Sequence, residues 1–259
     1  MAASRGYLRC TLAIADVELR KLLRDPTELV SRAIQPLLWL VVFGQVIGRI
    51  RGIDTGHVGY LAFMTPGILA QSVLFSAIFY GISVIWERDL GIVHKLLVSP
   101  APRSALILGK ALSADFRGVV QAAVIYLIAI ALGVPVRLDA GALIGLLLVV
   151  ALGAAVFATF SLVIACAVKT RERFMGIGQV LTMPLFFASN AIYPLSLMPA
   201  WLRAIALVNP LTYLVDALRG LMLQGGRSLY GLPWDCGVLL AVMLLLLAIA
   251  VRAYPHLVR

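Results

Sequence analysis

WERDLGIVHKLLVSPAPRSALILGK, residues 86–110, is a charged interruption between two long apolar runs. A chain embedded in a bilayer can be pushed by a soluble partner only where it offers polar surface outside the membrane. This stretch is therefore the predicted contact with a soluble partner.

The composition on either side of this stretch is that of a membrane protein. Hydrophobic residues make up 62% of the chain, charged residues 13%, and the mean hydropathy is +1.00, whereas soluble domains carry about 25% charged residues. A soluble chain of 259 residues needs more polar side chains to cover its surface. We predict an all-α polytopic membrane protein with one transmembrane domain at 33–259, preceded by a cytosolic segment at 1–32.

The net charge of +10 could indicate a nucleic-acid partner. The cations instead cluster in short segments between apolar runs, as expected for the loops of a membrane protein. We therefore expect membrane lipids around this chain and no nucleic acid.

Charge-free windows near 20 residues predict six transmembrane helices. They lie at about 33–48, 58–85, 118–134, 140–168, 174–192 and 232–251. The second would be about 42 Å long as a helix, so it must tilt or project beyond the bilayer. An even number of crossings places both termini on one side.

The distribution of cations predicts the orientation. Of the 22 Lys and Arg residues, 16 lie on the side of the termini. Cytoplasmic loops carry the excess of Lys and Arg, so both termini are predicted to be cytosolic in a cytoplasmic (inner) membrane. The six on the other side are Arg49, Arg51, Arg137, Arg203, Arg219 and Arg227.

The N-terminal segment carries an amphipathic pattern. Leu8, Leu12, Ala15, Leu19 and Leu22 recur at steps of three and four, with charges between them. This predicts a helix lying along the cytosolic membrane surface. A soluble helix folded over the loops is the alternative.

Motifs for catalysis or cofactor binding are missing from the sequence. Gly109 and Lys110 lack the earlier Gly and the following Ser or Thr of a phosphate-binding loop. His57, His94 and His256 fall in three separate segments, which gives no metal cluster or nucleophile-base pair. We predict no catalytic residue, no metal and no cofactor bound by this chain.

The predicted spans contain scattered polar and aromatic side chains but almost no ionisable groups, which proton relays usually require. Amides and hydroxyls can serve helix packing alone. The alternative is that some face a shared substrate path. The candidates are Gln71, Phe75, Phe79, Gln179, Phe186 and Asn190.

The region 190–226 is apolar but broken by three prolines, at 194, 199 and 210. Asn209 followed by Pro210 is a strong helix start, with Asn as N-cap and Pro at the first position. Two short helices at 198–208 and 210–223 are predicted, forming a hairpin that re-enters the membrane from the outer side. Asp216 and Arg219, three residues apart, can pair on one helix face, although an exposed ion pair on an outer loop is the alternative. The predicted outer gate comprises Tyr193, Pro194, Asn209, Pro210, Tyr213, Asp216 and Arg219.

Four blocks of sequence resemble the membrane subunits of ABC-2 type exporters, close to the daunorubicin-resistance and nodulation-type permeases. The most specific is SNAIYPLSLMPAWLRAIALVNPLTYLVDALRG at 189–220. ERDLGIVHKLLVSP at 87–100, with ILGK at 107–110, is similar to the loop after the second span, and ELRKLLRDP at 18–26 and QPLLWLVVFG at 35–44 match the start. One departure is His94, where the family often has an acidic residue, although Glu87 remains.

The resemblance implies a permease that works as a dimer, each copy docked to a cytosolic ABC ATP-binding subunit that holds ATP and Mg. It also implies a cytosolic coupling helix between the second and third spans, which forms the ATPase contact together with the N-terminal helix. The residues carried over are Glu18, Arg20, Lys21, Arg24, Glu87, Arg88, Asp89, Leu90, His94 and Leu97.

The function expected from the resemblance is export, driven by ATP hydrolysed in the partner. The spans carry neither a ring of charges nor an aromatic track, which favours an amphipathic, drug-like or lipid-like cargo. A passive channel or proton-driven carrier and an intramembrane lipid-modifying enzyme are the alternatives. The sequence leaves open whether the second permease copy is identical or homologous.

Overall fold

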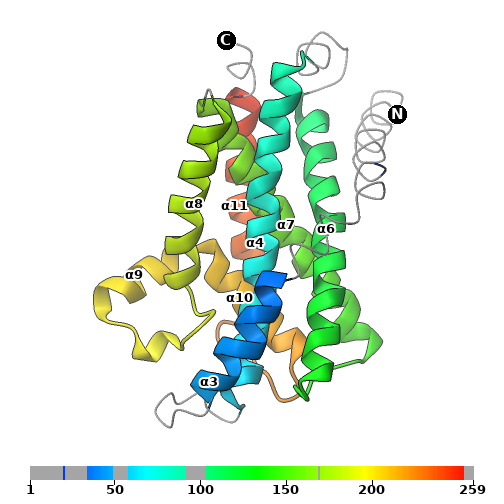
Figure 1. Cartoon of the computed structure of the whole chain (residues 1–259), viewed down its shortest axis with the longest axis vertical. Helices are drawn as coiled ribbons and strands as arrows, with labels where there is room; N and C mark the ends of the chain where they lie inside the picture. Colours follow the sequence, from blue (N-terminus) through cyan, green and yellow to red (C-terminus); the bar gives the residue numbers. More distant parts are fainter. Residues whose placement is uncertain (1–19, 21–33, 49–57, 92–102, 169, 254–259) are drawn as a thin grey trace.

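The computed structural model describes residues 20, 34–48, 58–91, 103–168 and 170–253. These residues form a helical bundle (Figure 1) and contain no strand beyond one isolated bridge between Val136 and Leu223. The elements are η1 (Trp39–Gly44), a π-helix, then α3 (Gln45–Gly48), α4 (Tyr60–Asp89), α6 (Arg103–Ala131), α7 (Ala140–Ala167), α8 (Arg171–Phe187), the 3-10 turn η2 (Leu195–Leu197), α9 (Ala200–Val208), α10 (Pro210–Met222) and α11 (Leu232–Ala253).

The helices support a polytopic membrane protein. Within the described ranges, three are long and apolar enough to cross a bilayer: Tyr60–Ile78 of α4, α7 and α11. The apolar helical stretches Ile34–Gly48 and Arg117–Ala131 are shorter. α9 and α10 meet at an angle of 79°, as in a broken span or a re-entrant loop. The number of six crossings stays a prediction.

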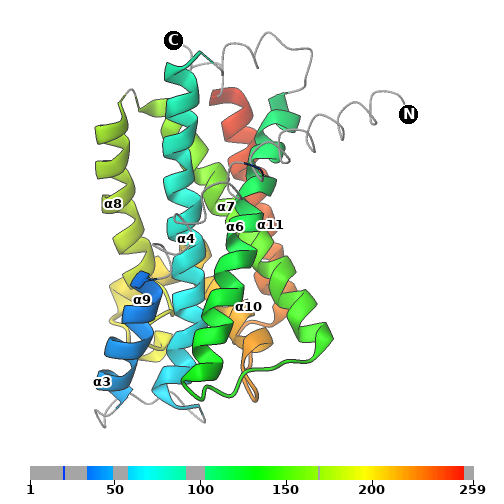
Figure 2. The same cartoon turned by 45° about the vertical axis from the view of Figure 1, so that its right-hand side comes forward.

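Helix α4 forms the centre of the bundle. It packs against α6, α7, α8 and α10 (Figures 1 and 2). Two close approaches hold it there. Ser161 of α7 donates a hydrogen bond to the Ile78 carbonyl at 2.6 Å, and a Cβ atom at Gly67 would lie 2.3 Å from the Ala191 carbonyl oxygen. With 30 residues, α4 spans about 45 Å from end to end.

Several helix boundaries differ from the predicted ones, and the third and fifth spans show the clearest differences. The predicted third span and the helical stretch before it are one continuous 29-residue helix, α6, which ends at Ala131 because Gly133, at φ 74°, turns the chain. The predicted fifth span corresponds to α8, which ends at Phe187, so residues 188–192 are turns outside the helix.

The predicted coupling helix does not begin at Glu87. Residues 87–89 form the last turn of α4, and the chain turns at Gly91, whose φ is 71°. His94 and Leu97 lie outside the described residues, and so do most of the predicted N-terminal helix and its Glu18, Lys21 and Arg24. Arg20 is helical and exposed.

Candidate functional site

The start of α10 is built around Asn209. Its Oδ1 accepts a hydrogen bond from the Leu211 N–H at 3.0 Å, and Pro210 occupies the first position, which confirms the predicted helix start. Its Nδ2 donates to the carbonyls of Leu185 and Ala188 at 2.7 and 2.8 Å. These carbonyls lie at the C-terminal end of α8, where backbone carbonyl groups have no N–H partner within the helix. One buried amide therefore joins α8 to α10.

Two tyrosines cap helix ends in the same region. The Tyr193 hydroxyl donates to the Phe187 carbonyl at the end of α8. The Tyr213 hydroxyl donates to the Leu207 carbonyl near the end of α9 at 2.7 Å. The segment between α8 and α10 is thus attached by side chains to the helices that precede and follow it.

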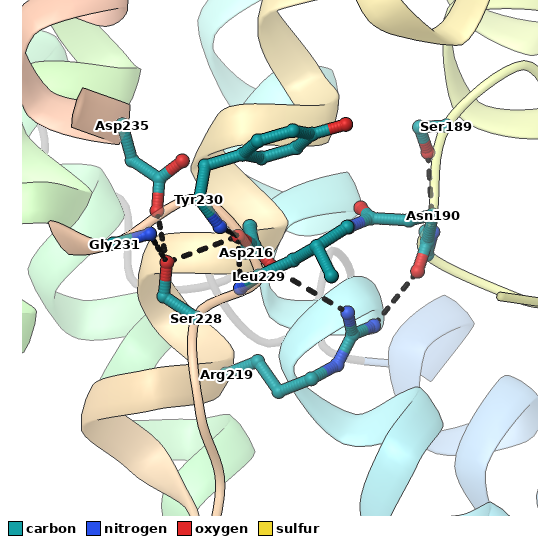
Figure 3. A network of polar contacts seen from close by, with 10 residues as sticks. Ser189, Asn190, Asp216, Arg219, Ser228, Leu229, Tyr230, Gly231 and Asp235 are labelled. Carbon is teal, nitrogen blue, oxygen red and sulfur yellow. Dashed lines mark hydrogen bonds and ion pairs between the residues drawn. The ribbon is translucent and has the colours of Figure 1, made fainter. Parts of the chain in front are cut away.

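Asp216 and Arg219 of α10 form the predicted i,i+3 ion pair at 3.9 Å. The side chains are 1% and 10% exposed, so the alternative of an exposed pair on a loop is wrong. Arg219 also donates to the Asn190 carbonyl at 2.7 Å (Figure 3). Its guanidinium stacks 4.0 Å above the ring of Phe63 in α4. A buried guanidinium tolerates burial when it is paired and hydrogen-bonded in this way.

The Asp216 carboxylate also anchors the loop between α10 and α11. Its Oδ2 accepts from the backbone N–H of Leu229 at 2.7 Å and of Tyr230 at 3.1 Å. The hydroxyl of Ser228 lies 3.0 Å from the same oxygen (Figure 3). One carboxylate therefore binds Arg219 within its own helix and two backbone donors of the following loop, and it lies within hydrogen-bond distance of the Ser228 hydroxyl.

Ser228 connects this carboxylate to a second one. Its Oγ lies 2.7 Å from Oδ2 of Asp235, the fully buried acid in the first turn of α11 (Figure 3). The Gly231 N–H donates to the same hydroxyl at 2.7 Å. Because a hydroxyl has one hydrogen, it can donate to only one of the two carboxylates at a time. We call Asn190, Asp216, Arg219, Ser228 and Asp235 the hairpin network.

Sequence reasoning missed Ser228 and Asp235. A signal was present for Asp235, because it is an acid inside the otherwise charge-free window 232–251, and ionisable groups within apolar spans are usually functional. Ser228 gave no such signal. Among the described residues, no group of three or more His, Cys, Asp or Glu side chains is placed to hold a metal ion.

The residues predicted to line a substrate path differ in how far they are buried in the single chain. Gln71, Phe186 and Asn190 are buried, Phe75 is partly buried, and Gln179 of α8 is exposed. The Gln71 Nε2 has no hydrogen-bond partner among the described residues. Phe186 packs edge-on against Trp39 of η1, with ring centroids 5.9 Å apart. Phe79 lies on α4, and its side chain is outside the described part of the structure. A common path stays a prediction.

The other end of α4 holds a second cluster of interacting residues, three of them charged. We call this cluster the clamp: Trp86, Arg88, Asp89, Val168 and Arg171. Arg88 donates to the Val168 carbonyl at 3.1 Å, and Asp89 pairs with Arg171 at 3.0 Å. The Arg171 guanidinium stacks 3.6 Å above the Trp86 ring. The clamp thus joins the end of α4 to the turn between α7 and α8.

The residues that are accessible at this end of α4 differ from those predicted. Glu87, predicted as a charged contact, is 6% exposed. Trp86 and Leu90 are 49% and 66% exposed. In the described part of this end, the surface open to a partner therefore includes two large apolar side chains.

The comparisons with known proteins agree with the blocks of sequence described above. A family model described as ABC-2 type transporter matches residues 9–223. The chain is 31% identical over 204 residues to the putative transport permease ycf38 of Cyanophora paradoxa, covering 77% of this chain and 69% of the relative. It is 29% identical over 227 residues to the daunorubicin resistance ABC transporter permease protein DrrB1 of Streptomyces coeruleorubidus, covering 86% and 77%.

A nodulation protein, Nodulation protein J of Rhizobium leguminosarum bv. trifolii, is 27% identical to the chain over 197 residues, covering 75% and 74%. The family match includes Asn190, Asn209, Asp216 and Arg219 and ends before Ser228. The extent of the match and the apolar helical bundle lead to one assignment. The chain belongs to the ABC-2 type transporter family.

Proposed function

We propose that this chain is the membrane subunit of an ATP-driven exporter of an amphipathic, drug-like or lipid-like molecule. A separate ABC subunit binds and hydrolyses ATP, and two permease copies form the route through the inner membrane, with both termini cytosolic. The family assignment supports this proposal, and the name of the Streptomyces coeruleorubidus relative refers to drug resistance.

The observation that carries the mechanism is the continuity of α4. Its last turn carries Trp86, Arg88 and Asp89 of the clamp, and its first turns carry Phe63, which lies under the Arg219 guanidinium of the hairpin network. Rigid secondary-structure elements can carry coupling between distant sites, and in this proposal a displacement at one end of α4 is passed to the other. Force from the ATPase would enter at the clamp and reach the hairpin network at Phe63, about 35–40 Å away along α4.

In this mechanism the hairpin network is the outer gate. Arg219 links α10 to α4 through Phe63 and to the turn after α8 through Asn190. A shift of α4 therefore changes the support of α10 directly. Closure of two ATPase subunits would move the clamp of each permease copy and open the gap between the two copies. The cargo would thus have access to the route from one side of the membrane at a time.

The first test concerns the docking of the ATPase subunit. Leu90→Ala, in the permease co-expressed with its ABC subunit, should raise the dissociation constant of the complex about tenfold, because the variant loses the apolar area that Leu90, 66% exposed in the free chain, would bury on docking. Pull-down and titration measure the change. Leu229→Ala is the matched control, since Leu229 is similarly exposed, at 67%, at the opposite end of the bundle. Equal effects of the two variants would remove Leu90 from the docking surface.

The second test concerns the source of energy. The permease purified alone should hydrolyse no ATP, and vesicles containing both subunits should export substrate only with ATP. Transport by the permease alone, or transport driven by a proton gradient, would count against the proposal and favour a channel or a carrier.

Sequence reasoning also predicts that Glu87→Ala uncouples ATP use from transport while membrane insertion stays intact.

A further inference from the structure

Two loops at the end of the bundle opposite the clamp line an open hollow of about 580 Å³. One loop connects α6 to α7, and the other connects α10 to α11; they lie at the same end in both views (Figures 1 and 2). The hollow is lined by Arg137, Leu138, Asp139, Gln224, Gly225, Gly226 and Arg227. The hollow is open on one side, and most of its lining side chains are polar.

The loops are held rigidly against each other. The Arg137 N–H donates to the Met222 carbonyl and the Gln224 N–H to the Pro135 carbonyl, both at 2.8 Å. The Gln224 side-chain amide donates to the Val136 carbonyl at 2.9 Å. Backbone and side-chain bonds thus fix the lining of the hollow without help from a ligand.

The charges of the hollow are unbalanced. Asp139 is its one carboxylate, and it already caps α7 through the Ala142 N–H at 3.0 Å and pairs with Arg137 at 3.4 Å. Arg227 is exposed and has no hydrogen-bond or ion-pair partner among the described residues. The lining carries two cations against one anion, which leaves one positive charge for a ligand.

The chemistry of the lining selects the ligand class. Guanidinium groups bind phosphate and carboxylate oxygens through paired N–H donors. Gly225, whose φ is 77°, has open space where a side chain would stand, so a bulky head group can approach the backbone there. We propose that this hollow binds a phosphate-bearing group through Arg137 and Arg227, from the head group of an anionic phospholipid or from a free phosphate ester.

Both arginines lie on the side predicted to be non-cytosolic, where only six of the 22 Lys and Arg residues fall. That location rests on the orientation in the proposed function. Under it, the phosphate group comes from the outer leaflet or from the medium outside. The proposed binding site does not depend on this orientation, because it rests only on the residues of the two loops.

The test uses the full chain in nanodiscs of phosphatidylcholine, with and without phosphatidylglycerol, and in detergent with glycerol phosphate. Phosphatidylglycerol or glycerol phosphate should bind saturably, and Arg227→Gln should raise the dissociation constant about tenfold, because it removes a charge-assisted donor. Arg227 makes no hydrogen bond or ion pair with the described residues, so this variant should fold normally. Arg203→Gln is the matched control, because Arg203 is an exposed arginine of α9, outside the hollow.

Binding of glycerol phosphate as tight as that of the lipid would identify a free phosphate ester, and preference for phosphatidylglycerol would identify the lipid. Saturable binding of neither probe, or equal losses in Arg227→Gln and Arg203→Gln, would overturn the proposal. A cysteine introduced at Leu229 and labelled with an impermeant reagent tests the orientation separately. Labelling only from the cytosolic side would refute the orientation and leave the binding result standing.

Discussion

Replacing Asp216 with alanine is expected to lower the free energy of unfolding by roughly 3–5 kcal/mol, the usual cost of breaking a buried ion pair. The change leaves the Arg219 guanidinium buried without its counter-charge. It also removes the acceptor for the backbone N–H groups of Leu229 and Tyr230. Since most proteins are stable by only about 5–15 kcal/mol, the variant should unfold at a much lower temperature. Thermal unfolding in detergent measures the loss.

Asp139→Ala is the control for this prediction. Asp139 also accepts a backbone hydrogen bond, from the Ala142 N–H at 3.0 Å, but its side chain is 58% exposed, so its loss should cost only about 1 kcal/mol. Asp216→Asn retains an acceptor oxygen and should fall between the two. If Asp216→Ala is no less stable than Asp139→Ala, the hairpin network does not hold α10 and the loop after it.

Asn209→Ala is the second change with a large expected effect, roughly 2–4 kcal/mol of stability. About 1 kcal/mol comes from the lost helix cap. The rest comes from the Leu185 and Ala188 carbonyls, which lose their donor in a buried environment. Because this amide joins α8 to α10, substrate-stimulated ATP hydrolysis by the assembled transporter should also fall.

The variant Asn209→Ser separates these two contributions. Serine caps a helix about as well as asparagine, but it cannot donate to the Leu185 and Ala188 carbonyls in the way that the amide does. The difference in free energy of unfolding between the alanine and serine variants measures the contribution of the helix cap. The loss of stability in the serine variant, relative to the native chain, measures the contribution of the connection to α8. A serine variant as stable as the native chain would show that the connection contributes nothing.

The Asn209–Pro210 boundary was predictable because a helix start depends on neighbouring residues. The two further bonds of the same amide were not, since their acceptors lie 24 and 21 residues earlier in the chain. The i,i+3 pairing of Asp216 and Arg219 was likewise predictable from helix geometry. Their burial was not, because it depends on α4 and on the loop at 228–230.

The charged stretch at the end of α4 shows the same division. Its charges were expected to face a soluble partner. In the structure, Arg88 and Asp89 bind the turn between α7 and α8, about 80 residues further along the chain, and Glu87 is buried. Composition cannot distinguish a charged side chain that is exposed for binding another protein from one that is already paired within the same chain.

The sequence by itself determined the membrane class, the apolar segments, the helix start at Asn209 and the resemblance to ABC-2 type exporters, because these depend on local composition and short motifs. Only the tertiary structure decided that Ser228 joins Asp216 to Asp235, that Arg219 reaches Phe63, and that α4 connects the clamp to the hairpin network. The physical reason is that desolvation and pairing of a charge depend on groups distant in sequence, which meet only when the helices pack.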